Sequence, residues 1–439
     1  MFPNLLDRLF SRRAPAAVPP PAPARTAAVA RATTPEPLVE APVGLGARRP
    51  LVSASGLLAG FEFGASAAIL GRLRPGSGDA AIRACVTNVL GAMRLCLNQK
   101  MIALAELPAG SLARIESDGD FRPGMHIILG ADTMVGDSAA MSALLVRLRR
   151  LGVALGWSVA GPSDMPVPPG QPDFAVVRQG EGAGADAWRR SIDAAAAERP
   201  GVPLLLLDVD GVDLMESLLR PPVAWAACAV GSNIAAARVN ALAPQAQRLL
   251  QLLNRLVRDD DNALLVADIK ADANLALRLL QYLNSAGATP GRELDSIDQA
   301  VLVLGRDALY RWVAQMLVRL SPQRPAAEAL RALALARARL LEMLARDVGE
   351  ASPGSFFLLG LASMLPLLLQ CSVEDATASL QLPPPAMEAL RLGTGPWHGY
   401  LSLALALERY DMATTEQLAQ PFGGLEVVLC HSTQAWLPN

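Results

Sequence analysis

Residues 356–369 read FFLLGLASMLPLLL and contain no charged side chain. A helix needs about 20 apolar residues to cross a bilayer core of about 30 Å, so this stretch is too short for a membrane span. Leu361 and Leu365 share one helix face at a spacing of four residues, and Pro366 predicts a kink or an end of the helix. The stretch therefore predicts a buried core helix, and we expect no transmembrane segment.

The sequence before this stretch also has helical periodicity. Residues 244–287 have amphipathic periodicity, with Asp259–Asp261 and Asp272 as predicted N-caps. The segment SIDQAVLVLG (296–305) begins with Ser296 as a predicted cap and ends at Gly305, and another helix follows at once. We therefore expect residues 239–439 to form an all-α domain.

The preceding region alternates short apolar runs with helical stretches. Predicted buried strands are MHIILGA (125–131), LGVALGWSV (151–159), DFAVVRQ (173–179) and VPLLLLDVD (202–210), with a helix over 138–151. Such alternation indicates a parallel sheet or barrel. We expect residues 51–238 to form an α/β domain, so the chain combines α/β and all-α domains.

The first 50 residues hold ten of the 34 prolines and are rich in alanine. A segment of this composition buries too little apolar surface to fold, so we expect residues 1–50 to be a disordered tether. Residues 1–13 place five apolar side chains at helical spacing, which is compatible with a docking peptide or with a frayed terminus.

Composition excludes several classes of function. The formal charge of −2 and the pI near 6.0 provide no basic surface for nucleic acid. Five scattered cysteines without a C-x-x-C pair indicate neither a zinc site nor a disulfide framework. The first residues lack the pattern of a signal peptide. We expect a cytoplasmic protein that carries no cofactor.

Three features of the helical half together resemble the HDOD domain, a bacterial signalling module related to the HD phosphohydrolases. They are DANLALRLLQYLNSAG (272–287), SIDQAVLVLG (296–305) at the expected distance after it, and FFLLGLASMLPLLL. The most specific part is Asn284, Ser285 and Ala286, which with Gly305 form a candidate interaction or structural motif. The resemblance implies a regulatory adaptor that acts through protein partners and has no defined reaction.

The same resemblance implies that a metal site has been lost. A catalytic HD domain has adjacent His and Asp where this sequence has Ser363 and Met364, and neither a hydroxyl nor a thioether is a strong ligand for a hydrolytic metal. The three histidines are far apart in sequence and show no metal-ligand spacing: His126, His398 and His431. We expect no HD-type catalysis.

Residues 51–238 resemble an EAL domain, the cyclic di-GMP phosphodiesterase fold built on a modified TIM barrel. In GLLAGFEFG (56–64), Glu62 is the one matched metal ligand. The resemblance places Gly156 and Trp157 where the family has paired aspartates, Leu129 near a glutamate position, and Val176 or Arg178 near a lysine position. In the last strand, LLLLDVDG, Asp208 and Asp210 remain, but Leu207 stands near the expected glutamate. Two-metal hydrolysis needs several converging carboxylates, so we expect a degenerate, non-catalytic domain.

Two alternatives remain open. The degenerate barrel could still bind cyclic di-GMP through arginine–phosphate contacts and act as a sensor. The motif Asp208-Val-Asp210-Gly is also how haloacid-dehalogenase-type phosphatases present a nucleophile and a general acid. That fold needs a downstream lysine and then an acidic pair, whereas here residues 259–261 precede Lys270 and both lie in the helical half. The favoured function is therefore a non-catalytic signalling or scaffold protein, ahead of a cyclic di-GMP sensor and an active phosphohydrolase.

Overall fold

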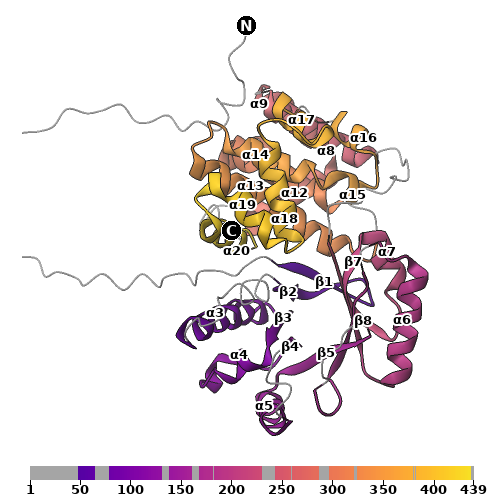
Figure 1. Ribbon diagram of the computed structural model, residues 1–439. Helices are drawn as coiled ribbons and strands as arrows, with labels where there is room; N and C mark the ends of the chain where they lie inside the picture. The colour runs from indigo at the N-terminus through magenta and orange to yellow at the C-terminus, as the bar shows by residue number, and fades with distance from the viewer. Residues whose placement is uncertain are drawn as a thin grey trace, which may run out of the picture.

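A computed structural model describes residues 48–64, 79–130, 138–160, 168–180, 182–229, 243–258, 260–285, 296–320, 324–378, 380 and 382–436. It contains a barrel domain followed by a helical domain that packs against one side of the barrel (Figure 1). The predicted combination of a TIM-barrel-like domain and an all-α domain is confirmed. The expected tether and docking peptide in residues 1–47 lie outside the described residues.

The barrel is closed and its strands follow chain order. The strands are β1 (Arg49–Ser53), β2 (Leu58–Glu62), β3 (Ile102–Pro108), β4 (Met125–Gly130), β5 (Ala154–Ala160), β6 (Phe174–Val177), β7 (Leu204–Asp210) and β8 (Val223–Ala229). Strands β2 to β8 are parallel to one another, whereas β1 is antiparallel to both β2 and β8. The first residue of β1 therefore lies at the end of the barrel where the parallel strands finish.

The four predicted strands correspond to β4, β5, β6 and β7, and the predicted helix to α5 (Ser138–Arg150). Two expectations need correction. Strand β7 is not the last, because β8 follows it, and β1 begins at Arg49 inside the region assigned to the tether. Strands β3 and β8 contain several alanines, which have low strand propensity, so their sequences gave a weak strand signal.

The barrel interior is filled with apolar side chains. Alternate residues of β7 face inward, so Leu205 and Leu207 join the inner cluster while Leu204 and Leu206 pack outside. The inner cluster consists of Leu51, Leu104, Ile128, Phe174, Val176, Leu205, Leu207 and Ala227. Polar chemistry is therefore confined to the ends of the barrel.

Helices cover the outside of the parallel strands. They are α3 (Asp79–Leu97), α4 (Ala109–Ala113), α5, α6 (Ala185–Glu198) and α7 (Val212–Leu218), with a short 3₁₀ helix at Asp118–Asp120. Among the described helices, α3 alone has a length and composition that would allow it to cross a membrane. Its residues Val89, Leu90 and Met93 are buried in the apolar cluster between α3 and the barrel.

The helical domain begins with α8. Its helices are α8 (Pro244–Val257), α9 (Asn262–Lys270), α10 (Ala273–Ser285), α11 (Ile297–Leu304), α12 (Arg306–Arg319), α13 (Ala327–Val348), α14 (Pro353–Ala362), α15 (Leu365–Leu369), α16 (Val373–Ala378), α17 (Pro384–Arg391), α18 (His398–Glu408), α19 (Met412–Ala419) and α20 (Leu425–Gln434), with a 3₁₀ turn at Gln420–Phe422. The carboxylates of Asp261 and Asp272 accept hydrogen bonds from backbone amides in the first turns of α9 and α10, as predicted for N-caps.

The stretch 356–369 is buried, as its length and composition predict. It forms two helices, because α14 ends at Ala362 and α15 starts at Leu365. Pro366 lies in the first turn of α15, where a missing amide costs nothing, so the break precedes the proline by several residues. Leu361 and Leu365 are both fully buried. Gly360 allows α14 to approach α13 closely, because an added Cβ would lie 2.7 Å from the Cα of Ala338.

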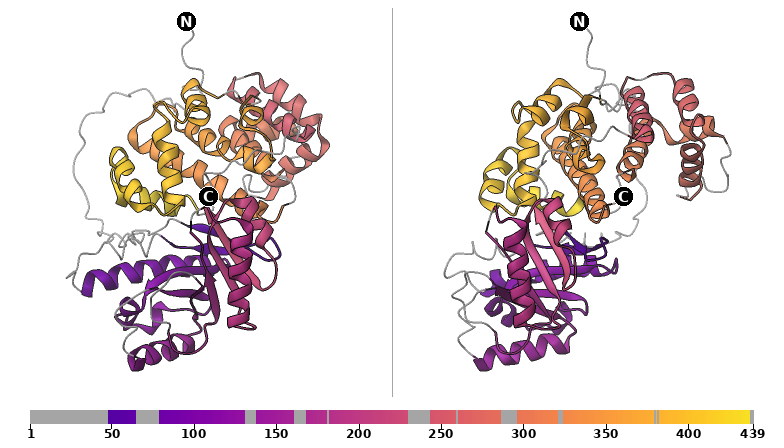
Figure 2. Two further views of the ribbon diagram at one scale, coloured as in Figure 1. Left: turned by 45° about the vertical axis from the view of Figure 1, so that its right-hand side comes forward. Right: turned by 90° about the vertical axis from the view of Figure 1, so that its right-hand side faces the viewer.

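The helical domain packs against one side of the barrel (Figure 2), where outward-facing residues of β1, β2 and β8 share apolar clusters with its helices. The rings of Phe61 in β2 and Trp436 lie 4.9 Å apart, edge to face. Arg324 donates to both carboxylate oxygens of Glu216 and to Asp213, around α7. The two apolar clusters that include Phe61 and Val52 continue into the helical domain.

We expect Leu361→Ala to lower the free energy of unfolding by about 2–5 kcal/mol, because a fully buried side chain leaves a cavity between packed helices. Leu277→Ala is the matched control, because Leu277 is 55% exposed on α10 and its loss should cost well under about 1 kcal/mol. Urea unfolding of the two variants measures both values. Equal losses would mean that α14 is not part of the core.

Candidate functional site

The barrel mouth, defined as the carboxyl ends of β2 to β8, carries charged residues. Glu62 ends β2, Glu106 lies near the end of β3, and Asp208 and Asp210 lie at the end of β7. Arg178 directly follows β6. Active sites of such barrels form at this end because the strands deliver their last side chains there. The mouth is therefore the first candidate site.

Arg49 enters the mouth from β1. It pairs in register with Glu62, so both side chains face inward. Its Nε donates to Glu62 Oε2 at 2.8 Å and its Nη2 donates to Asp208 Oδ1 at 2.7 Å. The side chains of Arg49 and Glu62 are only 5% and 6% exposed. Burial raises the pKa of the Glu62 carboxyl, and the contact with Arg49 opposes that rise.

Arg178 extends this network to the next strands. Its Nη2 donates to Glu106 Oε2 at 2.6 Å and its Nε donates to Asp208 Oδ2 at 3.3 Å. We call the five residues Glu62, Arg49, Asp208, Arg178 and Glu106 the mouth cluster. Each of its carboxylates accepts at least one hydrogen bond from a guanidinium group.

Asp208 is held in the mouth by an unusual backbone conformation. The pairing of β7 with β8 shifts register between Leu206 and Val209, and Asp208 has φ of 60°. Left-handed backbone is uncommon outside glycine, and a bulge re-aims side chains at barrel rims. Burial raises the pKa of Asp208, but Arg49 and Arg178 outweigh it and hold this pKa below its usual range.

Tyr410 of the helical domain reaches the same cluster. The guanidinium carbon of Arg49 lies 4.4 Å from the centre of the Tyr410 ring, and the Tyr410 hydroxyl donates to the backbone oxygen of Glu62 at 2.9 Å. The ring lies against Gly64, where an added Cβ would come within 2.1 Å of it. Burial and the nearby Glu62 raise the pKa of Tyr410, so it stays neutral. The mouth is thus joined to the helical domain.

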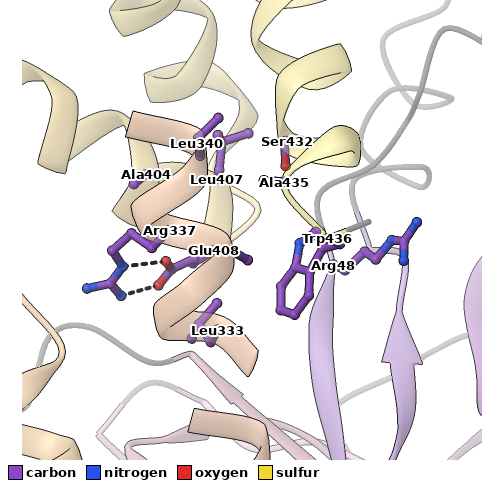
Figure 3. A pocket seen from close by; sticks show the side chains of 11 residues that line it. Arg48, Leu333, Arg337, Leu340, Ala404, Leu407, Glu408, Ser432, Ala435 and Trp436 are labelled. Carbon is purple, nitrogen blue, oxygen red and sulfur yellow. Dashed lines mark hydrogen bonds and ion pairs between the residues drawn. The ribbon is translucent and has the colours of Figure 1, made fainter. Parts of the chain in front are cut away.

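A second cluster, the core cluster, lies inside the helical domain and consists of Arg337, Glu408 and Ser363. Arg337 of α13 donates from Nε and Nη2 to the two oxygens of Glu408, at 2.8 and 2.6 Å (Figure 3). Its Nη1 donates to Ser363 Oγ at 2.8 Å, and that hydroxyl donates to Gly360 O at 2.6 Å. Arg337 and Glu408 are 3% and 11% exposed. Met364 is fully buried among apolar residues.

The pocket beside the core cluster is small. It is lined on one side by Arg337 and Glu408 and on the other by Trp436 and Arg48 (Figure 3). The guanidinium group of Arg48 points away from Arg337. Its volume is about 20 Å³, which is room for one water molecule. We therefore do not regard it as a ligand site.

Two of the predicted site positions lie outside the mouth. The inner side of Gly156 is occupied by the ring of Phe174, where an added Cβ would come within 2.3 Å. Trp157, one residue later, faces outward into the cluster that includes Leu148 of α5. Neighbouring strand residues face opposite sides, so Gly156 faces the barrel interior and Trp157 faces the helices outside it. Asp210 accepts a hydrogen bond from the Gly182 amide and holds the loop after β6.

The leucine predicted near the family's glutamate position faces away from the mouth. Leu129, on β4, faces the outer cluster, whereas Glu106 of the unpredicted strand β3 points into the mouth and pairs with Arg178. The mouth therefore keeps more carboxylates than the sequence comparison indicates. Glu106 was missed because β3 itself was missed.

The remaining motif residues lie at helix ends. Asn284 and Ser285 close α10, and Asn284 is exposed. Ala286 lies outside the described residues. Gly305 separates α11 from α12 with φ of 74°, a left-handed conformation that suits glycine. Gly305 thus has a structural role between two helices, and the interaction role of the motif stays a prediction.

The residues of the mouth do not fit a two-metal centre. Arg49 bridges Glu62 and Asp208, and Arg178 bridges Asp208 and Glu106, so cationic groups already occupy the space between the carboxylates. Across the described ranges, no group of three or more His, Cys, Asp or Glu side chains is arranged to hold a metal ion. We derive no reaction step through a metal here.

The phosphatase motif also lacks its expected partners. Asp208 pairs with two arginines, Lys270 pairs with Asp298 at 2.7 Å in the helical domain, and Asp261 caps α9. Lys270 and Asp261 therefore form contacts within the helical domain and not with Asp208 or Asp210 of β7.

Sequence reasoning missed Arg49, Tyr410, Arg337 and Glu408. Arg49 was assigned to the tether, although two arginines next to each other just before an apolar run are a usable signal for a strand start at a polar rim. No local signal identifies Tyr410 or Glu408, because their partners lie 348 and 71 positions away.

Residues 242–381 match the family model of the HDOD domain, which confirms the resemblance of the helical half. The chain is 27% identical over 184 residues to the uncharacterized protein YuxH of Bacillus subtilis, which is 41% of this chain and 45% of that protein. It is 29% identical over 151 residues to the cyclic di-GMP phosphodiesterase CdgJ of Vibrio cholerae, which is 34% of each. The chain thus spans less than half the length of these relatives.

Among solved structures, an EAL domain protein from Listeria monocytogenes aligns with a TM-score of 0.29 and 14% identity, over 41% of this chain and 84% of that one. The closed barrel is established by its own strand pairing. A closed barrel therefore precedes the region that matches the HDOD family model, and this match indicates a signalling-related protein.

We expect the contribution of Asp208 to depend on pH. Its pKa is below the unfolded value of about 3.9, so its ion pairs stabilise the fold above that pH and the stabilisation is lost as pH falls through the folded pKa. Asp208→Asn tolerates the left-handed backbone but removes the charge. The urea midpoint should therefore fall at pH 7, and the difference from the parent should shrink toward pH 3. A difference that grows at low pH would contradict this assignment.

Proposed function

We propose that this chain is a non-catalytic bacterial signalling or scaffold protein that acts through protein partners of its HDOD domain. The observation that carries the proposal is the saturation of both candidate sites by arginine. In the mouth cluster each carboxylate is bound by Arg49 or Arg178, and in the core cluster Arg337 binds Glu408 in a bidentate manner. Neither cluster offers a free carboxylate pair that could activate water.

The same contacts weigh against the cyclic di-GMP sensor. Arginine recognises phosphate through free N–H donors, but both mouth arginines donate to carboxylates. The described mouth residues include four carboxylates, Glu62, Glu106, Asp208 and Asp210, against two guanidinium groups. A phosphate would have to break these ion pairs and enter a negative field. The named activity of CdgJ is therefore not proposed for this chain.

Exposed apolar side chains support a protein-binding role for the helical domain. The ten large apolar side chains that are exposed among the described residues include five on the contacting helices α9, α10 and α11: Leu264, Leu277, Tyr282, Leu302 and Val303. Leu302 is 70% exposed. Several exposed apolar side chains on neighbouring helices are typical of protein interaction sites. We propose that partners bind there.

We also propose a cytoplasmic location. The five cysteines are free, and three of them are buried, which suits a reducing compartment. The slightly acidic composition supports protein rather than nucleic-acid partners.

The purified full chain should show no hydrolysis of cyclic di-GMP or of phosphomonoesters with Mg²⁺ or Mn²⁺, because arginine occupies the space between the mouth carboxylates. Calorimetric titration should show no cyclic di-GMP binding tighter than about 10 μM, about −7 kcal/mol. An active EAL phosphodiesterase under the same conditions is the positive control. Metal-dependent turnover that disappears in Asp208→Asn would refute the proposal.

Partner binding should depend on α11. A protein captured from the source organism by the full chain should be lost with Leu302→Asp and retained with Val146→Asp, which is 69% exposed on α5 of the barrel. The two changes place one charge at equally exposed positions, so both variants should fold. If Val146→Asp loses the partner and Leu302→Asp keeps it, the binding surface belongs to the barrel.

A further inference from the structure

The mouth cluster and the core cluster meet at one end of α18. Glu408, the last residue of α18, pairs with Arg337 in the helical domain. Two residues later, Tyr410 lies on Arg49 and bonds the backbone of Glu62 in the barrel. A single three-residue segment therefore touches both buried arginines.

We propose that residues 408–410 couple the two arginine clusters, so that a change at either one alters the stability of the other domain. In this arrangement the guanidinium groups of Arg49 and Arg337 act as permanent internal cations, and the barrel mouth serves as a joint for the helical domain. The coupling goes beyond the adaptor role, because it requires no partner and no ligand.

Backbone strain at Tyr410 supports a specific role for its side chain. Tyr410 has φ of 59° just after the end of α18, a position where glycine is the usual residue. An aromatic residue there is held in an uncommon conformation. The contacts of the ring with Arg49 and Gly64 offset the cost of this backbone conformation. Asp208, which pairs with Arg49, also has a left-handed backbone conformation.

Burial makes the two clusters sensitive to small changes. Arg49, Glu62 and Arg337 are each at most 6% exposed, and Glu408 is 11% exposed. A buried ion pair contributes little by itself, but removing one partner leaves an unpaired charge away from water. Tilting the end of α18 would disturb both pairs, because Glu408 and Tyr410 move together. This shared helix end is the physical basis of the coupling.

The test is reciprocal hydrogen exchange in the full chain. Arg337→Lys keeps the charge but loses the bidentate geometry. We expect amide exchange to become at least about threefold faster in β1 and β2, as well as around α14. Arg49→Lys should likewise speed exchange around Glu408 and in α14. The matched control is Arg147→Lys, which makes the same change at an arginine that pairs with Asp118 and contacts the ring of Phe121 within the barrel.

The control should change exchange in the barrel alone. If Arg337→Lys alters the helical domain alone and Arg49→Lys the barrel alone, the two clusters are independent and the proposal is wrong. Should Arg49→Lys fail to fold, Tyr410→Phe and Tyr410→Gly supply the second measurement. Tyr410→Gly relieves the backbone but removes the ring, so it should speed exchange in both domains more than Tyr410→Phe does. Equal exchange in these two variants would also overturn the coupling.

Discussion

The buried guanidinium group of Arg49 is the interaction on which the barrel mouth depends. Strand β1 runs antiparallel to its neighbours, so its first residue lies where the other strands end. That reversal brings a cation between Glu62 and Asp208. Without it, carboxylates from different strands would face one another in a partly buried space and repel. The direction of one short strand thus determines the electrostatics of the mouth.

The helical domain repeats this solution. Arg337 lies against Glu408 and the hydroxyl of Ser363, at the position where the HDOD resemblance implies a lost metal ligand. A guanidinium group is always protonated and forms planar bidentate contacts, so it satisfies buried carboxylates without an exchangeable ion. Both clusters are therefore complete from the chain's own residues. The core cluster joins α13 to α18, and the mouth cluster contacts Tyr410 of the helical domain.

The interface between the domains buries the outer side of β1, which packs against α13. Outward-facing residues of β1, β2 and β8 would expose apolar surface there, and the helical domain covers them with its own apolar residues. Polar contacts then fix the orientation of the two domains. Arg324 of the helical domain pairs with Asp213 and Glu216 of α7, and Tyr410 donates to the backbone of Glu62 at the mouth. The two domains share core clusters, so each depends on the other for part of its burial.

The sequence by itself determined the local features of this protein. Runs of apolar residues located β4 to β7, carboxylates located the caps of α9 and α10, and the length and composition of 356–369 identified a buried helical segment. These properties depend on neighbours a few residues apart. The HDOD resemblance rested on such local motifs, and the family match over 242–381 agrees with it.

Only the tertiary structure decided which charged residues meet. Successive residues of a strand face opposite sides, so Gly156 lies inside the barrel and Trp157, the next residue, lies outside it. An error of one residue in the strand register would therefore place a residue on the wrong side. Arg49, Asp208 and Tyr410 come together from three distant parts of the chain because barrel closure and domain packing place them at one rim. No local pattern encodes that meeting, since it depends on the register of several strands and on the position of a second domain.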